Sequence, residues 1–340
     1  MKKPIILAVE SSCDDTAVAI IKGNSILSNI IGVQHIHNFY GGVIPEIAAR
    51  SHQREIVILV HQAIFEAKIV KKQINAVAVT KGPGLIGSLL IGSSFVKSLA
   101  MAWKIPFIGV HHIQAHILSH FIERNGTPSP RFPFLCLTIS GGHTQIILVE
   151  NFFRMAILGQ TIDDAVGEAF DKIANVIGLH YPGGIWIDYY AKNGNPKKFI
   201  FSKSKIGGLD FSFSGFKTQF FSFIRKELKK DPKFIIHNLY DICASAQKSL
   251  VDFLFEKMIL AIKKTKIFSI ALSGGVSANS YLRKKFSKVA IKKGWELHLL
   301  PIEFTTDNAA MIAISAQMKY SRALFDDLTI LSGSNCGWNL

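Results

Sequence analysis

Residues 5–21 read IILAVESSCDDTAVAII, and this stretch decides the fold. An apolar run from Ile5 to Val9 is followed by a polar turn and by a second apolar run from Ala17 to Ile21, which predicts a strand, a turn and a strand. The same pattern returns in residues 134–149, FLCLTISGGHTQIILV, where Ser140-Gly141-Gly142-His143-Thr144 takes the place of the first turn. Two units of one pattern predict an internal duplication.

Strand and helix patterns alternate along the rest of the chain, which predicts an α/β architecture. The 340 residues are enough for two domains, each with a core of its own. Residues 125–130, NGTPSP, are the best candidate for a linker. We therefore expect a first half at residues 1–130, a second half at residues 131–325, and a C-terminal tail at residues 326–340 that packs back on the first half.

The basic residues are unevenly distributed. The chain has 39 basic and 24 acidic residues, a net charge of +15, and residues 192–293 alone hold 22 basic and 6 acidic residues, a net of +16. A basic segment of this kind favours a polyanionic partner. The alternative is biased composition, since Lys, Ile, Phe and Asn are all abundant, although such a bias should act along the whole chain.

Several classes of protein are disfavoured. No run reaches the ~18 apolar residues of a membrane span, and the first apolar run is too short for a secretory signal. The cysteines at positions 13, 136, 243 and 336 form no CxxC pair, so a disulfide framework and a zinc ribbon are unsupported. We expect a cytoplasmic protein with no membrane partner.

Histidines cluster after a short apolar run at residues 107–110. His112 and His116 are four apart, so on a helix both imidazoles lie on one face, a spacing that suits two ligands of one transition metal. The alternative is a polar helix face without a metal. A third ligand must come from elsewhere, and Asp307 is a candidate whose alternative role is to favour the start of the helix after it.

Glycine pairs or polar turns follow three of the predicted strands. Gly274-Gly275 precedes a helix, Gly141-Gly142 lies in the second polar turn, and residues 10–16 take the matching place in the first half. Glycine lets backbone N–H groups approach an anion, and a helix N-terminus favours phosphate. A plain tight turn explains any one pair, but the three together predict a nucleotide in a cleft between two similar halves.

Two further segments allow two interpretations each. Asp164, Glu168 and Asp171 share a helical face, where they could bind ribose hydroxyls or favour a helix start. Residues 211–218, FSFSGFKT, are typical of a surface that stacks RNA bases or of a strand with its Phe side chains directed inward.

In their order along the chain these segments resemble the TsaD family, the tRNA N6-adenosine threonylcarbamoyltransferases once labelled O-sialoglycoprotein endopeptidases. The resemblance runs from about Ile5 to Asp307. It includes the turn at 10–16, PEIAARSH at 45–52, GPG at 82–84, the His112-x-x-x-His116 pair, SGGHT at 140–144, GEAFDK at 167–172, FSGFKT at 213–218, GGVSAN at 274–279 and Thr306-Asp307.

The resemblance implies the fold of actin, the heat-shock chaperone ATPases and the sugar kinases, in which two duplicated α/β halves enclose a nucleotide cleft. By motif position it implies one divalent metal, iron or zinc, on His112, His116 and Asp307. His111 is then not a ligand, and His120 lies beside the metal or on the surface. Asp14 and Asp15 match acidic catalytic positions. The adenylate part of the substrate is expected on Thr138, Ile139, Ser140, Gly141, Gly142, Asp171, Gly184 and Asn279.

The implied activity is an acyl transfer from threonylcarbamoyl-AMP to N6 of adenosine 37, in tRNAs that read codons beginning with A. AMP is released, and bacterial family members work with TsaB and TsaE. A kinase or ATPase of the same fold is the alternative, disfavoured because phosphoryl transfer needs Mg²⁺ on oxygen ligands. A metallopeptidase is disfavoured because Ile113 stands where HExxH enzymes carry their general base. A scaffold protein without activity is disfavoured, because it would not need both the metal ligands and the glycine loops.

The resemblance also gives the basic segment a partner, the anticodon arm of tRNA. We expect the segment to lie along the approach of that arm to the cleft. Neutralisation of Arg283, Lys284 and Lys285 is then expected to weaken tRNA binding and to flatten its salt dependence.

Overall fold

The computed structural model describes residues 3–124, 126–204, 206–334 and 336. The chain forms two compact units: unit 1 comprises Met1–Ser129 and Thr306–Leu340, and unit 2 comprises Pro130–Thr305. Unit 2 is therefore inserted, in sequence, between two parts of unit 1. This differs from the expected boundary at residue 325, because residues 306–325 group with unit 1.

The sheet of unit 1 has five strands in the order β3-β2-β1-β4-β5. β1 pairs antiparallel with β2 across the polar turn and parallel with β4, which confirms the predicted strand, turn and strand. The strands are β1 (Ile5–Glu10), β2 (Thr16–Lys22), β3 (Ser25–Gly32), β4 (Ala76–Gly82) and β5 (Phe107–His111).

The sheet of unit 2 repeats this plan in the order β8-β7-β6-β9-β10. β6 pairs antiparallel with β7 and parallel with β9, as β1 does with β2 and β4. The same order and the same strand directions confirm the internal duplication. The strands are β6 (Phe134–Ile139), β7 (Thr144–Val149), β8 (Met155–Gln160), β9 (Ser269–Ser273) and β10 (Glu296–Leu299).

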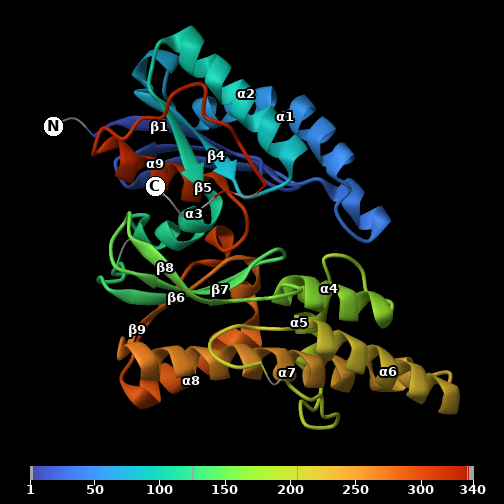
Figure 1. Cartoon of the computed structure of the whole chain (residues 1–340). Helices are drawn as coiled ribbons and strands as arrows, with labels where there is room; N and C mark the ends of the chain where they lie inside the picture. Colours follow the sequence, from blue (N-terminus) through green and yellow to red (C-terminus); the bar gives the residue numbers. More distant parts are fainter. Residues whose placement is uncertain (1–2, 125, 205, 335, 337–340) are drawn as a thin grey trace. The chain divides into compact units, whose positions relative to one another are not determined.

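The sheet of unit 1 is covered on both faces (Figure 1). Leu7, Val9 and Ile20 pack in one core with residues of α1 (Pro45–Glu66) and α2 (Ile86–Trp103). α9 (Ala309–Tyr320) contacts all five strands, and its residues 309–317 are all buried, which is typical of a helix in the interior. Unit 1 also contains α3 (His112–Leu118) and the 3₁₀ helices η1 (His35–Tyr40), η2 (Lys71–Gln73) and η3 (Ser119–Phe121).

Within the described residues, α2 alone has the length and mean hydropathy, 1.3, that a membrane span needs. One such helix is weak grounds for a membrane, because a core helix can pass the same test. Leu89, Val96 and Ala100 of α2 are buried in unit 1.

The helices of unit 2 pack around alternate residues of β6. Leu135, Leu137 and Ile139 share a core with Phe170 and Leu254. The helices are α4 (Val166–Val176), α5 (Gly183–Ala191), α6 (Ser214–Lys230), α7 (Phe234–Thr265) and α8 (Ser280–Lys293), with the 3₁₀ helices η4 (Gly275–Ala278) and η5 (Ile302–Phe304).

The C-terminal segment returns to unit 1. The Asp326 carboxylate accepts hydrogen bonds from the Gly109 N–H, at 2.8 Å, and from the Lys319 ammonium, at 2.7 Å. The Gly333 N–H donates to the carbonyl of Lys81 at 3.0 Å. The described part of the expected tail therefore contacts the ends of β4 and β5, and residues 335 and 337–340 lie outside the described residues.

Candidate active site and metal centre

Three side chains of unit 1 converge on one point. His112 and His116 lie one turn apart on α3, directly after β5, and Asp307 lies two residues before α9. Nε2 of His116 is 3.0 Å from Asp307 Oδ1, and Nε2 of His112 is 3.5 Å from the same oxygen. The three ligand atoms lie within 4.8 Å of one another. Two imidazole nitrogens and a carboxylate oxygen so close together fit one divalent transition metal.

The environment of the cluster leaves one side open. His116 is fully buried, whereas the Asp307 side chain is 25% exposed. Structural metal sites are closed, whereas catalytic sites combine three protein ligands with a position for water or substrate. Three ligands, one of them partly exposed, favour the catalytic kind.

A buried carboxylate fixes the orientation of the first histidine. Glu10, at the end of β1, lies with Oε2 3.1 Å from His112 Nδ1 and accepts a hydrogen bond from the Thr80 hydroxyl at 2.6 Å. Burial alone would raise the pKa of Glu10, but His112 and Thr80 lower it overall, so the carboxylate stays ionised. Glu10 therefore holds the proton at Nδ1 of His112 and leaves Nε2 with a lone pair for a metal.

The polar turn of residues 11–15 brings further acidic groups to the same region. Burial, followed by the charges of Asp14, Asp307 and Glu10, raises the pKa of Asp15 to about 7. Such a shift indicates that like charges are crowded in a poorly solvated place. This electrostatic environment favours a cation.

Two helices hold this turn in place. His52 of α1 lies 2.7 Å from the Thr16 hydroxyl through Nδ1 and 2.9 Å from the carbonyl of Cys13 through Nε2. The hydroxyl of Ser88 on α2 donates to the same carbonyl at 2.9 Å. The PEIAARSH motif therefore forms the start of α1, the GPG motif precedes α2, and both helices hold the turn that carries Asp14 and Asp15.

The glycine loops of unit 2 lie at one edge of its sheet. Thr138 of β6 and Ser273 of β9 are in register, and their hydroxyl oxygens are 3.1 Å apart. Because β6 and β9 are parallel, the loops of residues 140–142 and 274–279 follow at the same edge. Backbone N–H groups and a helix N-terminus at such an edge suit an anionic ligand.

Hydrogen bonds join the remaining candidate residues of unit 2 to these loops. The Gly167 N–H donates to the Ser140 carbonyl at 3.2 Å, and Asp171 accepts from the Gly183 N–H at 2.7 Å. Asp188 of α5 accepts from the Ser280 hydroxyl at 2.8 Å. The segments that carry Ser140, Asp171, Gly184 and Asn279 are thus linked in series.

The sequence is similar to one family along nearly its whole length. The model of the TsaD family, tRNA N6-adenosine threonylcarbamoyltransferase, matches residues 25–314. The chain belongs to the TsaD family. A relative of that name in Christiangramia forsetii is 53% identical over 329 residues, which are 97% of this chain and 97% of the relative. Relatives of the same name in Riemerella anatipestifer and Porphyromonas gingivalis are 53% and 49% identical, each over at least 96% of both chains.

Solved structures at lower identity share the TsaD fold. HypF from T. kodakarensis gives a TM-score of 0.65 at 15% identity, covering 96% of this chain and 49% of HypF, so the chain spans about half of that protein. The activator of the 2-hydroxyisocaproyl-CoA dehydratase from Clostridium difficile, with bound ADPNP, gives 0.51 at 13% identity and covers 96% and 100%. With the two repeated sheets, these likenesses confirm the duplicated α/β fold of the actin-like ATPases.

Asp307 of this TsaD chain does not cap the helix that follows it. Asn308 fills that position, because its side chain accepts a hydrogen bond from the Met311 N–H at 3.1 Å, and α9 begins at Ala309. Thr306, although of a residue type that often caps helices, therefore does not cap α9. Asp307 is left to face His116, as expected of a ligand.

The other two histidines near the TsaD motif lie outside the ligand cluster. His111 caps α3, and its Nε2 lies 3.1 Å from the carbonyl of Cys336. Burial lowers the pKa of His111 to about 4. His120 is fully buried in η3, so of its two expected positions, beside the metal or on the surface, the surface position is wrong.

The acidic face of α4 is mostly engaged within the fold. Asp164 lies 2.8 Å from the Lys172 ammonium, which also pairs with Glu168. Asp171 alone reaches the Gly183 loop. Of the three carboxylates, the structure thus keeps Asp171 as the candidate for a ligand contact.

Asn279 is placed differently from expectation. The glycine pair Gly274-Gly275 was expected to lead directly into a helix, but η4 intervenes and α8 begins at Ser280. Asn279 caps α8, because its Oδ1 accepts from the Leu282 N–H at 3.0 Å, and its Nδ2 donates to Gln247 at 3.2 Å. Its side chain fixes the loop.

The FSFSGFKT motif builds the core of unit 2. Phe211 and Phe213 are buried and lie within 5.8 Å of the Phe253 ring, centroid to centroid, so neither can stack on a base. The expected strand is also wrong beyond Phe213, because α6 begins at Ser214. Asp163 accepts hydrogen bonds from the Ser212 hydroxyl, the Phe213 N–H and the Ser214 hydroxyl, at 2.6 to 2.8 Å.

The Asp163 contacts predict a pH-dependent contribution to stability. Burial acts to raise the pKa of Asp163, but its hydrogen bonds lower the pKa overall. The ionised carboxylate therefore stabilises the folded state fully above the unfolded pKa of about 3.9, and this stabilisation is lost as the pH falls through the lower folded pKa. We expect Asp163→Asn to lower the free energy of unfolding by about 1 kcal/mol at pH 7, a value discounted for exposure. Urea unfolding at a series of pH values from 7 downward tests this; a difference between variant and parent that does not shrink as the pH falls would contradict it.

Glu10 is the functional residue that the sequence reasoning missed. In the sequence it is one residue of the polar turn 10–16, and its contact with His112 was not predicted. A carboxylate at the end of a fully buried strand is costly unless it has partners, and that was the available signal.

Proposed function

We propose that this chain transfers the threonylcarbamoyl group of threonylcarbamoyl-AMP to N6 of adenosine 37 in tRNAs that read codons beginning with A. The observation that carries the proposal is the TsaD match along nearly the whole chain. The His112, His116 and Asp307 cluster supports it, because the residues at the matching motif positions converge in space.

We assign one divalent metal, Fe²⁺ or Zn²⁺, to this cluster. When bound, it supplies Lewis-acid stabilisation of negative charge on the acyl group. His112 and His116 would bind it through Nε2, and Asp307 through Oδ1. Glu10 keeps the proton on Nδ1 of His112, so the nitrogen nearer Asp307 remains a donor to the metal.

The reaction forms a bond between N6 and the carbamoyl carbon and breaks the bond from that carbon to the phosphate oxygen. AMP leaves with the electron pair, and N6 loses a proton. We assign the carboxylates of Asp14 and Asp15 to accept that proton, because a positioned carboxylate can act as a general base.

Direct transfer is the simplest course for the acyl group. The nearest thiol to the acidic turn belongs to Cys13, and burial together with the Asp14 and Asp307 charges raises its pKa well above the usual range. The thiol is the form present at neutral pH, and the thiolate is the nucleophile. Acid quenching during turnover should therefore trap no acyl-enzyme.

In unit 2 we assign the adenylate to the loops at the edge of the sheet. The residues concerned are Thr138, Ile139, Ser140, Gly141, Gly142, Asp171, Gly184 and Asn279. Backbone N–H groups of the glycine loops suit the phosphate. Asp171 holds the loop at Gly183 by accepting a hydrogen bond from its N–H. Asn279 holds the start of α8 by accepting one from the Leu282 N–H.

The partners follow from the family. We propose the tRNA anticodon arm as substrate, TsaB-like and TsaE-like proteins as partners, and the cytoplasm as location. Unit 1 exposes apolar side chains on its adjacent helices α1 and α2, among them Val57, Ile58, Leu90 and Met101. Such side chains favour a protein partner.

The test supplies the chain, both partner proteins, threonylcarbamoyl-AMP and unmodified tRNA. We expect N6-threonylcarbamoyladenosine at position 37 and one AMP released per nucleoside formed, measured by mass spectrometry of digested tRNA. A tRNA with guanosine at position 37 is the matched control. AMP release without modified nucleoside would contradict the proposal.

A further inference from the structure

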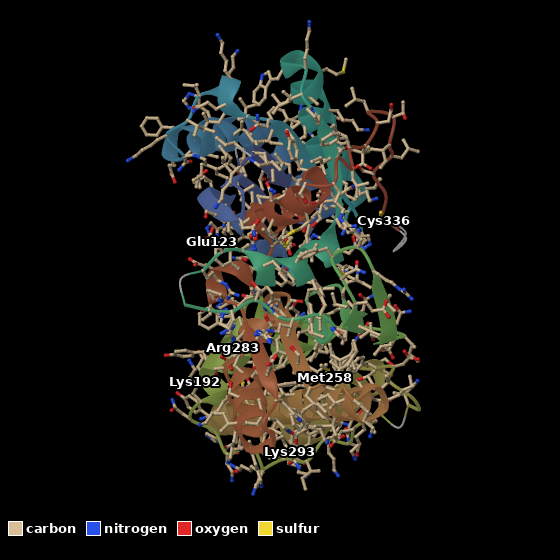
Figure 2. The ribbon with its side chains drawn as sticks, turned by 90° about the vertical axis from the view of Figure 1, so that its left-hand side faces the viewer. Glu123, Lys192, Met258, Arg283, Lys293 and Cys336 are labelled. Carbon is tan, nitrogen blue, oxygen red and sulfur yellow. The ribbon has the colours of Figure 1, made fainter. Side chains whose placement is uncertain are left out.

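Helix α8 carries a dense set of cations and no acid. Residues 280–293 read SYLRKKFSKVAIKK, with one Arg and five Lys. Leu282, Phe286 and Ala290 are buried at intervals of four, so they define the inward face. Arg283 and Lys293 lie near the opposite ends of the helix (Figure 2).

Two of these cations serve the fold. The Arg283 guanidinium donates to the carbonyl of Ser277 at 2.9 Å and to that of Leu300. Lys285 pairs with Asp252 and lies 4.8 Å from the centre of the Phe255 ring. Arg283 and Lys285 are thus engaged within unit 2, and the expectation that Arg283, Lys284 and Lys285 bind tRNA together stays a prediction.

Three other lysines face outward. Lys284, Lys288 and Lys292 are all exposed, and among the described residues none of them forms an ion pair. They are four residues apart, so they follow one side of the helix at steps of about 6 Å. We call them the α8 lysine stripe.

Helix stability does not explain the stripe. Lys292 lies in the last turn, where the helix dipole favours a cation, but Lys284 and Lys288 lie between the first and the last turn, where the dipole gives a cation little stabilisation. α8 contains no acidic residue that could pair with them. Neither the helix dipole nor an ion pair among the described residues therefore accounts for these two lysines.

The topology gives the stripe a direction. α8 begins after η4 and Asn279, at the loop edge of the sheet, and ends before β10. Because β9 and β10 are parallel neighbours, the C-terminal ends of α7 and α8 lie at the opposite edge, with Lys263, Lys264 and Lys266 beside the start of β9. The three lysines of the stripe therefore lead away from the loops of residues 140–142 and 274–279 and span about 12 Å of the helix.

We propose that the α8 lysine stripe binds the phosphate backbone of the tRNA substrate. This inference rests on the proposed function, since it takes tRNA as the ligand. Evenly spaced cations without acids suit a strand of phosphates. A protein partner would require an apolar centre, and Ile291 is the only large exposed apolar residue recorded on α8 within the described chain.

The test replaces Lys284, Lys288 and Lys292 with Gln, which removes three charges and keeps helix-forming side chains. The matched control replaces Lys68, Lys71 and Lys72 of unit 1, which are equally exposed lysines. We expect the stripe variant to bind tRNA about tenfold or more weakly at low salt. The slope of log affinity against log salt should fall by about 2 to 3, whereas the control should change little.

Steady-state kinetics separates this inference from the proposed function. If the stripe binds tRNA, the variant should raise KM for tRNA and leave kcat and KM for threonylcarbamoyl-AMP unchanged. Wild-type-like tRNA affinity in a variant of an active enzyme would overturn the stripe and leave the function intact. An equal loss of tRNA affinity in the control variant would show an effect of net charge alone and would also overturn the proposal. A stripe variant that loses only its binding to the partner proteins would overturn it as well. An inactive wild-type enzyme would contradict the proposed function instead.

Discussion

The double variant His112→Ala, His116→Ala should retain no stoichiometric metal and should form the modified nucleoside about a thousandfold more slowly than the parent. Both imidazoles direct Nε2 toward Asp307 Oδ1, so the variant keeps one ligand of three. A metal that stabilises acyl-transfer charge contributes several kcal/mol, and each ~1.4 kcal/mol is a factor of ten in rate. Elemental analysis of the purified protein and single-turnover transfer measure the two effects.

His61→Ala on the exposed surface of α1 is the matched control, and it should change neither quantity. Because His116 is fully buried, thermal unfolding should accompany the assay to show that the variant is folded. A folded double variant with parental activity would rule out a metal role for α3.

Gly274→Ala should damage unit 2 in two ways. Gly274 has φ +85° and ψ 160°, a conformation open almost solely to glycine, and a Cβ there would lie 2.4 Å from the carbonyl oxygen of Ile139. We expect a loss of about 3 kcal/mol in the free energy of unfolding, from backbone strain and from displacement of β6. Since Ile139 and Ser140 are assigned to the adenylate, KM for threonylcarbamoyl-AMP should also rise by at least about tenfold.

Gly215→Ala provides the comparison within the same unit. Gly215 lies in the first turn of α6, and a Cβ there meets nothing within 4 Å. This variant should be as stable as the parent or slightly more so. Urea unfolding and initial rates measure both variants; equal stability of the two would contradict the close approach of Gly274 to Ile139.

The fold was predictable where the sequence repeats a local pattern. The strand, turn and strand at residues 5–21 and 134–149 gave the duplication, because buried strands leave continuous apolar runs. The place of α9 was not predictable. Its residues 309–317 are buried on every side, so no polar stripe indicates which sheet it covers.

In the candidate site, too, residues close in sequence were predictable as neighbours and residues distant in sequence were not. The four-residue spacing of His112 and His116 predicted a shared face, and the helix α3 confirms it. Asp307 is 191 positions from His116, and spacing carries no information over that distance. The residues alone therefore left Asp307 as either a ligand or a helix-start residue, and the family resemblance favoured the ligand. The contact of Glu10 with His112 was not predicted, because the turn of residues 10–16 does not show which distant side chain its first carboxylate meets.

The insertion of unit 2 into unit 1 sets the order in which the metal centre can be made. A ribosome delivers His112 and His116 early, and then synthesises all of unit 2 before Asp307 and α9 appear. At about 5 to 20 residues per second, those 191 residues take about 10 to 40 s. During that interval the nascent chain has two imidazoles but no carboxylate between them, and one face of its first sheet lacks α9. The proposed metal site can therefore be completed only after unit 2 has been synthesised.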